Sequence, residues 1–321
     1  MRVLVTGGAG NIGLAVLDQL AFANIKTALF DLPQQIEMNR ALINADTEVF
    51  QGSVLDKSSL SEALRGCTHV IHLAAVLGVQ NTETNNLNCL EINTKGTENV
   101  LSGSISEKVS KFVFASSSEV YGEPLKLPIN EDSITQGKTL YAISKLAGEE
   151  FVKAYSQRYS FLNYSILRLF NSFGPNQVGQ FVITKFLHNA MVNKPIVING
   201  DGEQLRSFCY VDDTARGIVA ALKSDKANAE VINIGNQNNF VTINDLARII
   251  LEILNLDEDE RIIYNPDFDN SDRDKGREIF QRCPDTSKAK LLLGFEAEIG
   301  LEEAIKKVIK YGSFNESWPE D

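Results

Sequence analysis

Tyr141 and Lys145 are the residues whose types and spacing point most directly to chemistry, within the segment Tyr141-Ala-Ile-Ser-Lys145. The segment is predicted to be helical, and residues four apart on a helix share one face. An ammonium beside a phenol favours the phenolate, so we expect Lys145 to lower the pKa of Tyr141 below its usual value of about 10. The tyrosine would then serve as an acid or base. The alternative is an ordinary surface pair, since this spacing also arises by chance.

A second polar group follows a predicted strand over Lys111–Ser117 and reads Ser116-Ser117-Ser118-Glu119-Val120-Tyr121-Gly122. Hydroxyls and a carboxylate that leave a buried strand together are unusual for packing alone. The end of such a strand is where an open α/β sheet binds ligands. We therefore expect some of these side chains at a site and others, with Ser116 as an open case, in a solvated loop.

A glycine-rich loop directly follows the first predicted strand and opens a helix. Gly7 allows the tight turn, Gly10 lets backbone N–H groups reach a pyrophosphate, and Gly13 lets the helix pack closely on the strand. This context favours a dinucleotide site over an ordinary turn. The cofactor-binding residues predicted in this loop are Gly7, Gly10, Asn11, Ile12 and Gly13.

An acid ends the second predicted strand, at the interval after the glycine loop that dinucleotide sites show. The Asp31 carboxylate would accept the adenosine ribose hydroxyls and repel a 2′-phosphate, so we predict NAD rather than NADP. The alternative is a loop acid. Small residues also end the fourth strand, where Leu73, Ala74 and Ala75 would let the backbone approach the cofactor; the alternative there is core packing.

Strand-like runs alternate with helical stretches through the first half of the chain. Their nearly continuous apolar character is typical of strands buried on both faces. This alternation predicts an α/β fold with a Rossmann-type, doubly wound parallel sheet. The predicted strands are Arg2–Thr6, Thr27–Asp31, Thr47–Gln51, His69–Ala75, Lys111–Ser117 and Tyr164–Phe170, with Val231–Gly235 returning to the same sheet.

Composition bounds the class of protein. The chain has 321 residues, 43% of them hydrophobic, which suffices for one large domain or two interlocked ones. A net charge of −11 without a basic stretch argues against nucleic-acid binding. No apolar run reaches membrane-spanning length, so we expect no membrane segment.

The cysteines and histidines suggest a compartment and argue against a metal. The four cysteines and three histidines are scattered without metal-ligand spacing, so we expect no metal site. Scattered thiols are typical of reduced, cytoplasmic proteins. The first predicted strand begins at Arg2, which leaves no room for a leader peptide, and we therefore expect a cytoplasmic protein.

Several segments, taken in order and spacing, resemble an extended short-chain dehydrogenase/reductase of the NAD-dependent nucleotide-sugar epimerase/dehydratase family. The resemblance covers nearly the whole chain. The matching segments are Thr6–Gly13, His72–Ala75, Asn93–Thr97, Ser116–Gly122, the Tyr141/Lys145 pair, Leu167–Pro175, Gly200–Asp213 and Pro284–Ala289.

The resemblance implies a role for each matching residue. Tyr141 would take the proton from the sugar C4 hydroxyl as hydride moves to NAD. Lys145 would bind the nicotinamide ribose, and Ser117 would hydrogen-bond the reacting oxygen. Asn171 and Arg206 match positions that hold the nucleotide diphosphate, which implies a nucleotide-diphosphate sugar as the substrate.

A second source of positive charge for that diphosphate is the group Arg273, Arg277 and Arg282, of which we place Arg282 at the substrate. A surface role is the alternative for each.

One departure from the family concerns the cofactor. Relatives usually carry Gly-Asp after the third strand, with the carboxylate on the adenine amine, whereas this chain has Gly52-Ser53. Either the serine hydroxyl substitutes in part or the contact is lost.

The reaction that follows C4 oxidation depends on Ser118 and Glu119. In 4,6-dehydratases of the family an aspartate stands at the position of Ser118 and protonates the leaving hydroxyl. A simple 4-epimerase usually lacks the glutamate. NDP-uronate decarboxylases resemble this chain in Glu119, as a general base or acid, and in an Arg-x-Pro-Asp segment, here Arg282-Cys-Pro-Asp285. The alternative for Glu119 is a solvated carboxylate at the cleft rim.

We therefore expect a 4-epimerase, with an NDP-uronate decarboxylase close behind and a 4,6-dehydratase third. A noncatalytic NAD-binding scaffold is the hypothesis from another class, but such relatives typically lose the tyrosine or the lysine. A carbonyl reductase that uses free cofactor is disfavoured by the long second half and by Asn171 and Arg206.

We expect an NAD-binding domain of residues 1–172 plus about 208–241. A smaller, discontinuous α/β domain for the nucleotide sugar would comprise about 173–207 plus 242–321. The helices around Asn93–Ser106 and Leu140–Tyr159 resemble those that pair in the family's dimers, which implies a homodimer.

Overall fold

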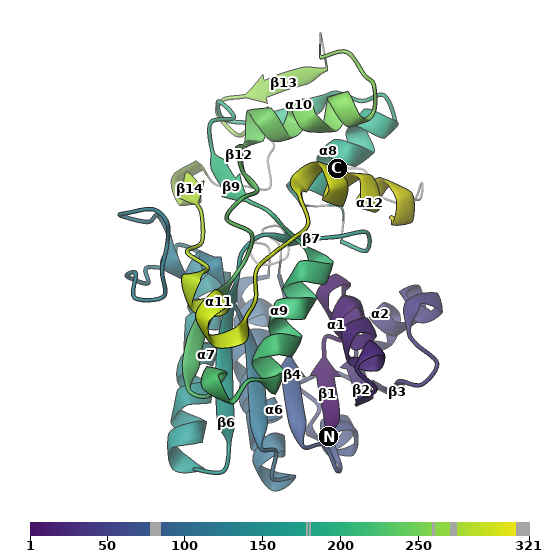
Figure 1. Cartoon of the computed structure of the whole chain (residues 1–321), viewed down its shortest axis with the longest axis vertical. Coiled ribbons are helices and arrows are strands. Elements are labelled where there is room, and N and C mark those ends of the chain that lie inside the picture. Colours follow the sequence, from purple (N-terminus) through teal and green to yellow (C-terminus); the bar gives the residue numbers. More distant parts are fainter. Residues whose placement is uncertain (78–84, 178, 180, 259–260, 270–274, 313–321) are drawn as a thin grey trace.

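A seven-stranded parallel sheet forms the larger part of the molecule (Figure 1). The computed structural model describes residues 1–77, 85–177, 179, 181–258, 261–269 and 275–312. The strand order β11-β6-β5-β4-β1-β2-β3 confirms the predicted doubly wound fold. The strands are β1 (Arg2–Thr6), β2 (Lys26–Asp31), β3 (Glu48–Gln51), β4 (His69–His72), β5 (Lys111–Ser117), β6 (Asn163–Leu169) and β11 (Glu230–Ile234).

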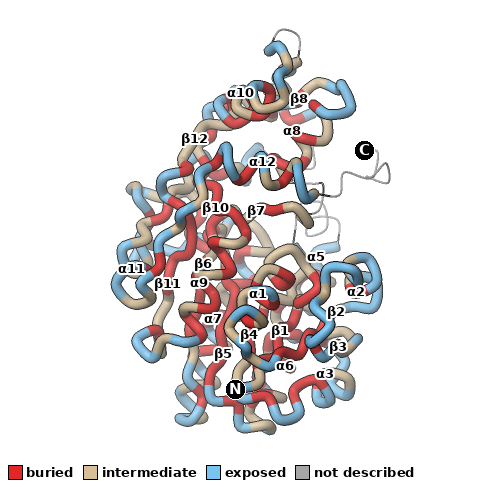
Figure 2. Tube along the Cα trace, turned by 45° about the vertical axis from the view of Figure 1, so that its right-hand side comes forward, coloured by how far each residue is buried: buried red, intermediate tan, exposed pale blue. Residues whose placement is uncertain are grey.

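The sheet separates two hydrophobic cores, because successive side chains of a strand point to opposite faces. On β1, Val3 and Val5 join one core and Leu4 joins the other. Figure 2 shows the buried residues concentrated along these strands. The helices on the first face are α1 (Asn11–Phe22), α2 (Pro33–Met38), α9 (Val211–Lys223) and α11 (Ser287–Leu293), and those on the second are α3 (Lys57–Leu64), α6 (Gly96–Ser106) and α7 (Leu140–Arg158).

Short elements complete this part of the chain. They are α5 (Asn86–Leu90), a π-helical turn η2 (Glu91–Lys95), and the 3-10 turns η1 (Arg40–Leu42), η3 (Ser118–Tyr121) and η4 (Asp225–Ala227). The predicted strand over His69–Ala75 is too long, since β4 ends at His72. Its neighbour β1 ends at Thr6, whose carbonyl accepts Leu73 N, and the ladder has no further partner on that side.

A second, smaller part lies beyond the carboxyl edge of the main sheet (Figure 1). It has its own core, centred on Phe186, Ile198 and Ile250. Its helices are α8 (Val182–Met191), α10 (Ile243–Ile253) and α12 (Leu301–Tyr311). Its strands are β8 (Ile196–Asn199) with β13 (Ile262–Asn265), and β9 (Leu205–Ser207) with β12 (Phe240–Thr242) and β14 (Gln281–Arg282). The strands β7 (Ser172–Phe173) and β10 (Cys209–Tyr210) pair where the two parts meet, and the 3-10 turn η5 (Lys275–Arg277) precedes β14.

The division into two domains stays a prediction, and one helix departs from it. The helix α11 falls within the residues predicted for the second domain. Its Ala289, with the nearby Phe295, lies instead in the core on the first face of the main sheet. Within the described ranges, we find no helix whose length and apolar content would let it cross a membrane.

The close approach of α7 to β5 requires a glycine at position 148. A Cβ on Gly148 would lie 2.4 Å from Cζ of Phe114, a fully buried ring. We expect Gly148→Ala to lower the free energy of unfolding by about 1–3 kcal/mol, because the ring or the helix must move. Urea titration would measure this loss. The control is Glu150→Ala on the same helix, which removes an exposed ion pair with Lys153 and should cost less than about 0.5 kcal/mol; equal losses would contradict the packing argument.

Candidate active site

The glycine loop joins β1 to α1 and leaves space at the start of the helix. Gly7 has a φ of 69°, and a Cβ there would lie 2.7 Å from Ala74 N. A Cβ on Gly13 would lie 2.3 Å from the Gly7 carbonyl oxygen, so the helix and the loop touch. A Cβ on Gly10 would meet, among the described residues, only that carbonyl oxygen within 4 Å, at 3.4 Å. The loop is therefore tight on the protein side and open above Gly10.

The first residues of α1 can hold an anion in this space. Gly10 is the N-cap, and Asn11 and Ile12 begin the helix. N–H groups in the first turn of a helix have no partner within it, and the helix dipole makes that end positive. The predicted loop residues therefore have the arrangement that a pyrophosphate needs.

Asp31 ends β2 beside this loop. Its carboxylate accepts N–H groups from Ala9 (2.9 Å) and Leu32 (2.8 Å). Burial raises the pKa of Asp31, while these two N–H groups act in the opposite direction. The contacts fix the carboxylate at the edge of the loop, where a ribose would lie. Gly52-Ser53 is where this chain differs from the family's Gly-Asp. There the Ser53 hydroxyl accepts a hydrogen bond from Leu55 N (3.2 Å) and closes a local turn.

The residues after β4 complete the predicted cofactor site. Leu73 N donates to the Thr6 carbonyl, and Ala74 lies against Gly7, so this segment crosses over the glycine loop. Ala75 follows directly. His72, which ends the strand, was not predicted to matter. Its buried ring hydrogen-bonds the hydroxyls of Thr6 (2.6 Å) and Thr97 (3.0 Å).

Tyr141 and Lys145 lie on α7, whose N-cap is Thr139. The Lys145 ammonium donates to the Ala115 carbonyl at the end of β5 (2.8 Å) and lies 5.6 Å from the centroid of the Tyr141 ring. Burial lowers the pKa of Lys145 to about 8. The Ser117 hydroxyl hydrogen-bonds the Tyr141 phenol. The structure therefore brings together the three side chains that the sequence singled out for acid–base chemistry.

The pKa of Tyr141 differs from the expectation. Burial raises it well above its usual range, and the nearby charge of Glu119 raises it further, whereas the hydrogen bond from Ser117 lowers it. Lys145 does not reverse this, because its ammonium is directed to the Ala115 carbonyl and lies 5.6 Å from the centroid of the Tyr141 ring, without a hydrogen bond to the phenol oxygen among the described contacts. In the protein alone the phenol is therefore held in its protonated form.

The turn η3 presents the rest of the serine-rich segment. Ser118 is buried, and Glu119 is partly exposed. The Glu119 carboxylate accepts the Thr139 hydroxyl (3.1 Å), and its other oxygen lies 3.9 Å from Nη1 of Arg282. Thr139 also accepts Ala142 N (3.1 Å), so one side chain both starts α7 and holds Glu119. Sequence reasoning missed Thr139, although Thr immediately before a helix is a recognisable N-cap signal.

Two of the residues predicted for the diphosphate lie on neighbouring strands, and the third, Asn171, lies between β6 and β7. Arg206 on β9 and Arg282 on β14 are in register, which directs their side chains to one face. The Arg206 guanidinium is buried (6% exposed) and paired with Glu278. Asn171, with a φ of 28°, donates to the Ser207 carbonyl (2.9 Å) beside Arg206.

The predicted group contains two more arginines. Arg277 is exposed in η5, and Arg273 lies outside the described residues. Arg282 is therefore the member of that group that the structure places beside the candidate site.

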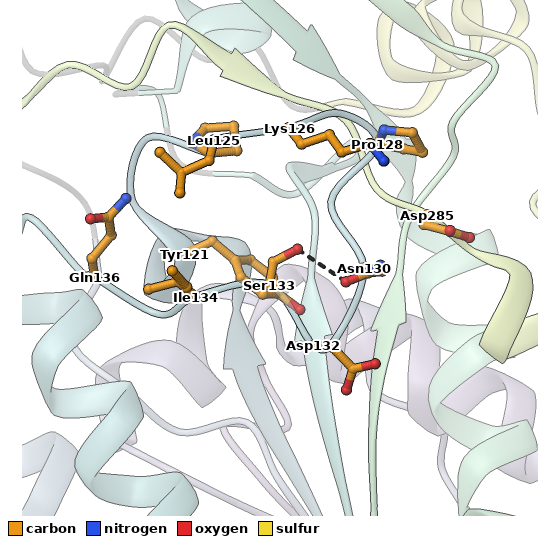
Figure 3. Close-up of a pocket in the computed structure, with 11 residues that line it drawn as sticks. Tyr121, Leu125, Lys126, Pro128, Asn130, Asp132, Ser133, Ile134, Gln136 and Asp285 are labelled. Carbon is orange, nitrogen blue, oxygen red and sulfur yellow. Dashed lines mark hydrogen bonds between the residues drawn. The ribbon is translucent and has the colours of Figure 1, made fainter.

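The loop between η3 and α7 encloses a separate pocket of about 390 Å³ (Figure 3). Tyr121 lines it, together with loop residues such as Asn130 and Asp132. Asp285, from the segment between β14 and α11, also lines it. Neither Tyr141 nor Lys145 is among its lining residues. This pocket is therefore not formed by the side chains proposed for acid–base chemistry.

Most of the chain is similar to known proteins. A family model described as the NAD dependent epimerase/dehydratase family matches residues 3–235. The chain is 34% identical over 315 residues to a putative UDP-glucose 4-epimerase of Methanocaldococcus jannaschii, covering 96% of this chain and 97% of the relative. It is 31% identical over 319 residues to a UDP-N-acetyl-alpha-D-glucosaminuronate decarboxylase of Bacillus cytotoxicus, covering 97% of each.

A solved structure is similar over the same extent. The UDP-glucuronic acid 4-epimerase from Bacillus cereus, in complex with UDP-glucuronic acid and NAD, gives a TM-score of 0.87 at 28% identity, covering 97% of this chain and 98% of that one.

Asp31→Ala tests the cofactor site. Removing the carboxylate should weaken NAD binding by about tenfold to a hundredfold, because hydrogen bonds to a charged group are lost. It should also reduce the discrimination against NADP. Calorimetric titration with each dinucleotide would measure both effects. Asp18→Ala, on the exposed side of α1, should leave both affinities unchanged; an unaltered NAD affinity in Asp31→Ala would overturn the assignment.

Proposed function

Because the chain belongs to the NAD dependent epimerase/dehydratase family, we propose that it oxidises C4 of a nucleotide-diphosphate sugar and reduces it again in the same catalytic cycle. The supporting observation is the group formed by Tyr141, Ser117 and Lys145. It lies at the same edge of the sheet as the glycine loop, where open α/β sheets bind their ligands.

NAD fits the residues at this edge. The open space above Gly10 and the first N–H groups of α1 suit the pyrophosphate, and Asp31 suits the adenosine ribose. Lys145, whose ammonium is directed to the end of β5, would hold the nicotinamide ribose. When bound, NAD supplies the acceptor for the C4 hydride and returns that hydride to the sugar.

The acid–base work falls to Tyr141. Its phenol would take the proton of the C4 hydroxyl during oxidation and return it during reduction. The Ser117 hydrogen bond favours the phenolate and also suits the sugar oxygen that reacts. On the substrate's other side, Asn171 and Arg206 are proposed to hold the diphosphate. Arg206 would have to share its guanidinium between the diphosphate and Glu278.

The first candidate outcome is 4-epimerisation. It needs the C4 machinery alone, together with room for the 4-keto sugar to present its other face before reduction. The similarity to the putative UDP-glucose 4-epimerase of Methanocaldococcus jannaschii supports this choice.

A second candidate is decarboxylation of a nucleotide-linked uronate, favoured by the Glu119–Arg282 pair. The two side chains lie 3.9 Å apart next to Tyr141, and a guanidinium there suits a sugar carboxylate. The decarboxylase of Bacillus cytotoxicus is also similar to this chain. A 4,6-dehydratase has less support, since Ser118 offers no acid for the leaving hydroxyl.

We also propose a homodimer formed through α5, η2, α6 and α7. Two large apolar side chains in this region are exposed, Leu87 (67%) on α5 and Ile143 (48%) on α7. Burying them against a second copy would remove apolar surface from water.

Tyr141→Phe tests the proposed chemistry. The variant should retain NAD and lose turnover by at least about a hundredfold, because the acid–base group is removed while the ring remains. Turnover of UDP-glucose, UDP-glucuronate and the corresponding GDP, CDP and dTDP sugars would be followed by chromatography that separates the sugar isomers, coupled to mass spectrometry. Tyr159→Phe, at the far end of α7, should keep full turnover. Undiminished turnover in Tyr141→Phe would contradict the assignment.

Glu119→Gln separates the candidate outcomes. If the chain is a decarboxylase, the variant should lose carbon dioxide release from the uronate and keep any C4 epimerisation, because only the former needs the carboxylate. Product masses decide the class: an isomer of unchanged mass means epimerisation, loss of carbon dioxide means decarboxylation, and loss of water means dehydration. Equal loss of every activity would contradict a separate role for Glu119.

A further inference from the structure

The end of β5 is joined to α7 by contacts spaced one helical turn apart. Two of them involve Tyr141 and Lys145 and belong to the candidate site. The third is one turn further along α7, where the Ser116 hydroxyl donates to Oε1 of Glu149 (2.5 Å). Neither Ser116 nor Glu149 has a role in the proposed chemistry, yet both are buried directly behind it.

Glu149 is part of a buried ion pair. Its side chain is 1% exposed, and Arg168 on β6 donates to both of its oxygens, from Nε (3.0 Å) and Nη2 (2.8 Å). Taking two charges out of water is costly, and a pair of this kind is often no better for stability than apolar residues. Stability alone is therefore a weak explanation of a buried pair at this place.

The pair is continued by further polar contacts across the sheet. Arg168 lies 4.7 Å from the centroid of the Tyr121 ring and donates to the Glu131 carbonyl (3.3 Å). The Tyr121 hydroxyl donates to Asn233 on β11 (2.7 Å). These contacts fix the guanidinium, which in turn fixes the Glu149 carboxylate against β5 and α7.

Several ionisable groups face Lys145 from the elements around it. Tyr141 and Glu149 come from α7, Cys89 from α5 and His72 from β4. Burial raises the pKa of Cys89 and lowers that of His72 to about 3, so both are neutral near pH 7. Glu149 lies one helical turn beyond Lys145 on α7, and the two side chains contact adjacent residues of β5, Ser116 and Ala115. Burial lowers the pKa of Lys145 to about 8, while Cys89 and Glu149 act in the opposite direction; Glu149 is the carboxylate of these two.

We propose that Glu149, fixed by Arg168 and Ser116, is a positioning residue that keeps Lys145 protonated and aligned on Tyr141 and the cofactor ribose. This inference rests on the proposed function, in which Lys145 must carry a proton to bind the ribose. Removing the carboxylate would take away both the ion-pair partner of Arg168 and a negative charge that favours the Lys145 ammonium. Lys145 would then lose its proton at a lower pH.

The test compares Glu149→Gln with wild type over a range of pH. The alkaline limb of kcat should move to lower pH by about one unit, so that turnover above the limb falls about tenfold. The same shift should be visible in the pH dependence of NAD affinity, measured by calorimetry. This second measurement does not depend on turnover. If wild type turns over no nucleotide sugar, the proposed function fails, while a shifted NAD profile still supports the role of Glu149.

Control variants separate positioning from general stability. Glu150→Gln, the next residue on α7 and 72% exposed, should leave both profiles unchanged. Glu149→Asp retains the charge and should keep the limb in place with a lower kcat. If Glu149→Gln does not fold, the double variant with Arg168→Gln removes both buried charges, and its limb should still lie below that of wild type. A folded variant without the carboxylate whose kcat and NAD profiles match wild type would overturn the proposal.

Discussion

The packing of α7 against the last residues of β5 is the contact on which the candidate site depends. Gly148 lets the helix lie directly on the strand, and three successive turns of the helix then contact the last three residues of the strand, Ala115, Ser116 and Ser117. Tyr141 and Lys145 share one face of α7, and this contact directs that face to the strand end. Glu149 extends the same contact into the core, where Arg168 holds it.

This arrangement has an electrostatic consequence. Burial disfavours the charged form of each group, so it raises the pKa of Tyr141 and lowers that of Lys145. Tyr141 is therefore hard to ionise, and Lys145 loses its proton easily. The protonation states at the site thus depend on nearby charges. The carboxylates of Glu119 and Glu149 act here in different ways, the first on the phenol and the second on the ammonium.

The smaller part of the molecule brings Arg282 to the candidate site. Ile129 forms a bridge with Pro284, and β14 pairs with β9, so the segment that carries Arg282 is held over η3. Arg282 thereby comes within 3.9 Å of Glu119, from a position far away in the chain. Under the proposed function, the residues that would select the fate of an oxidised sugar are thus shared between the two parts, whereas those proposed for the oxidation lie on the main sheet and its helices.

The sequence by itself determined the doubly wound sheet, the family and the residue types at the site, because these depend on local patterns: apolar strand runs, a glycine loop and motifs of fixed spacing. It missed the end of β4, which the length of β1 decides, and the packing of α11 on the main sheet. The tertiary structure alone decided the pKa of Tyr141, the pairing of Arg206 with Glu278 and the meeting of Glu119 with Arg282. Burial and contacts between distant segments set these properties, and neither is written in the spacing of residues along the chain.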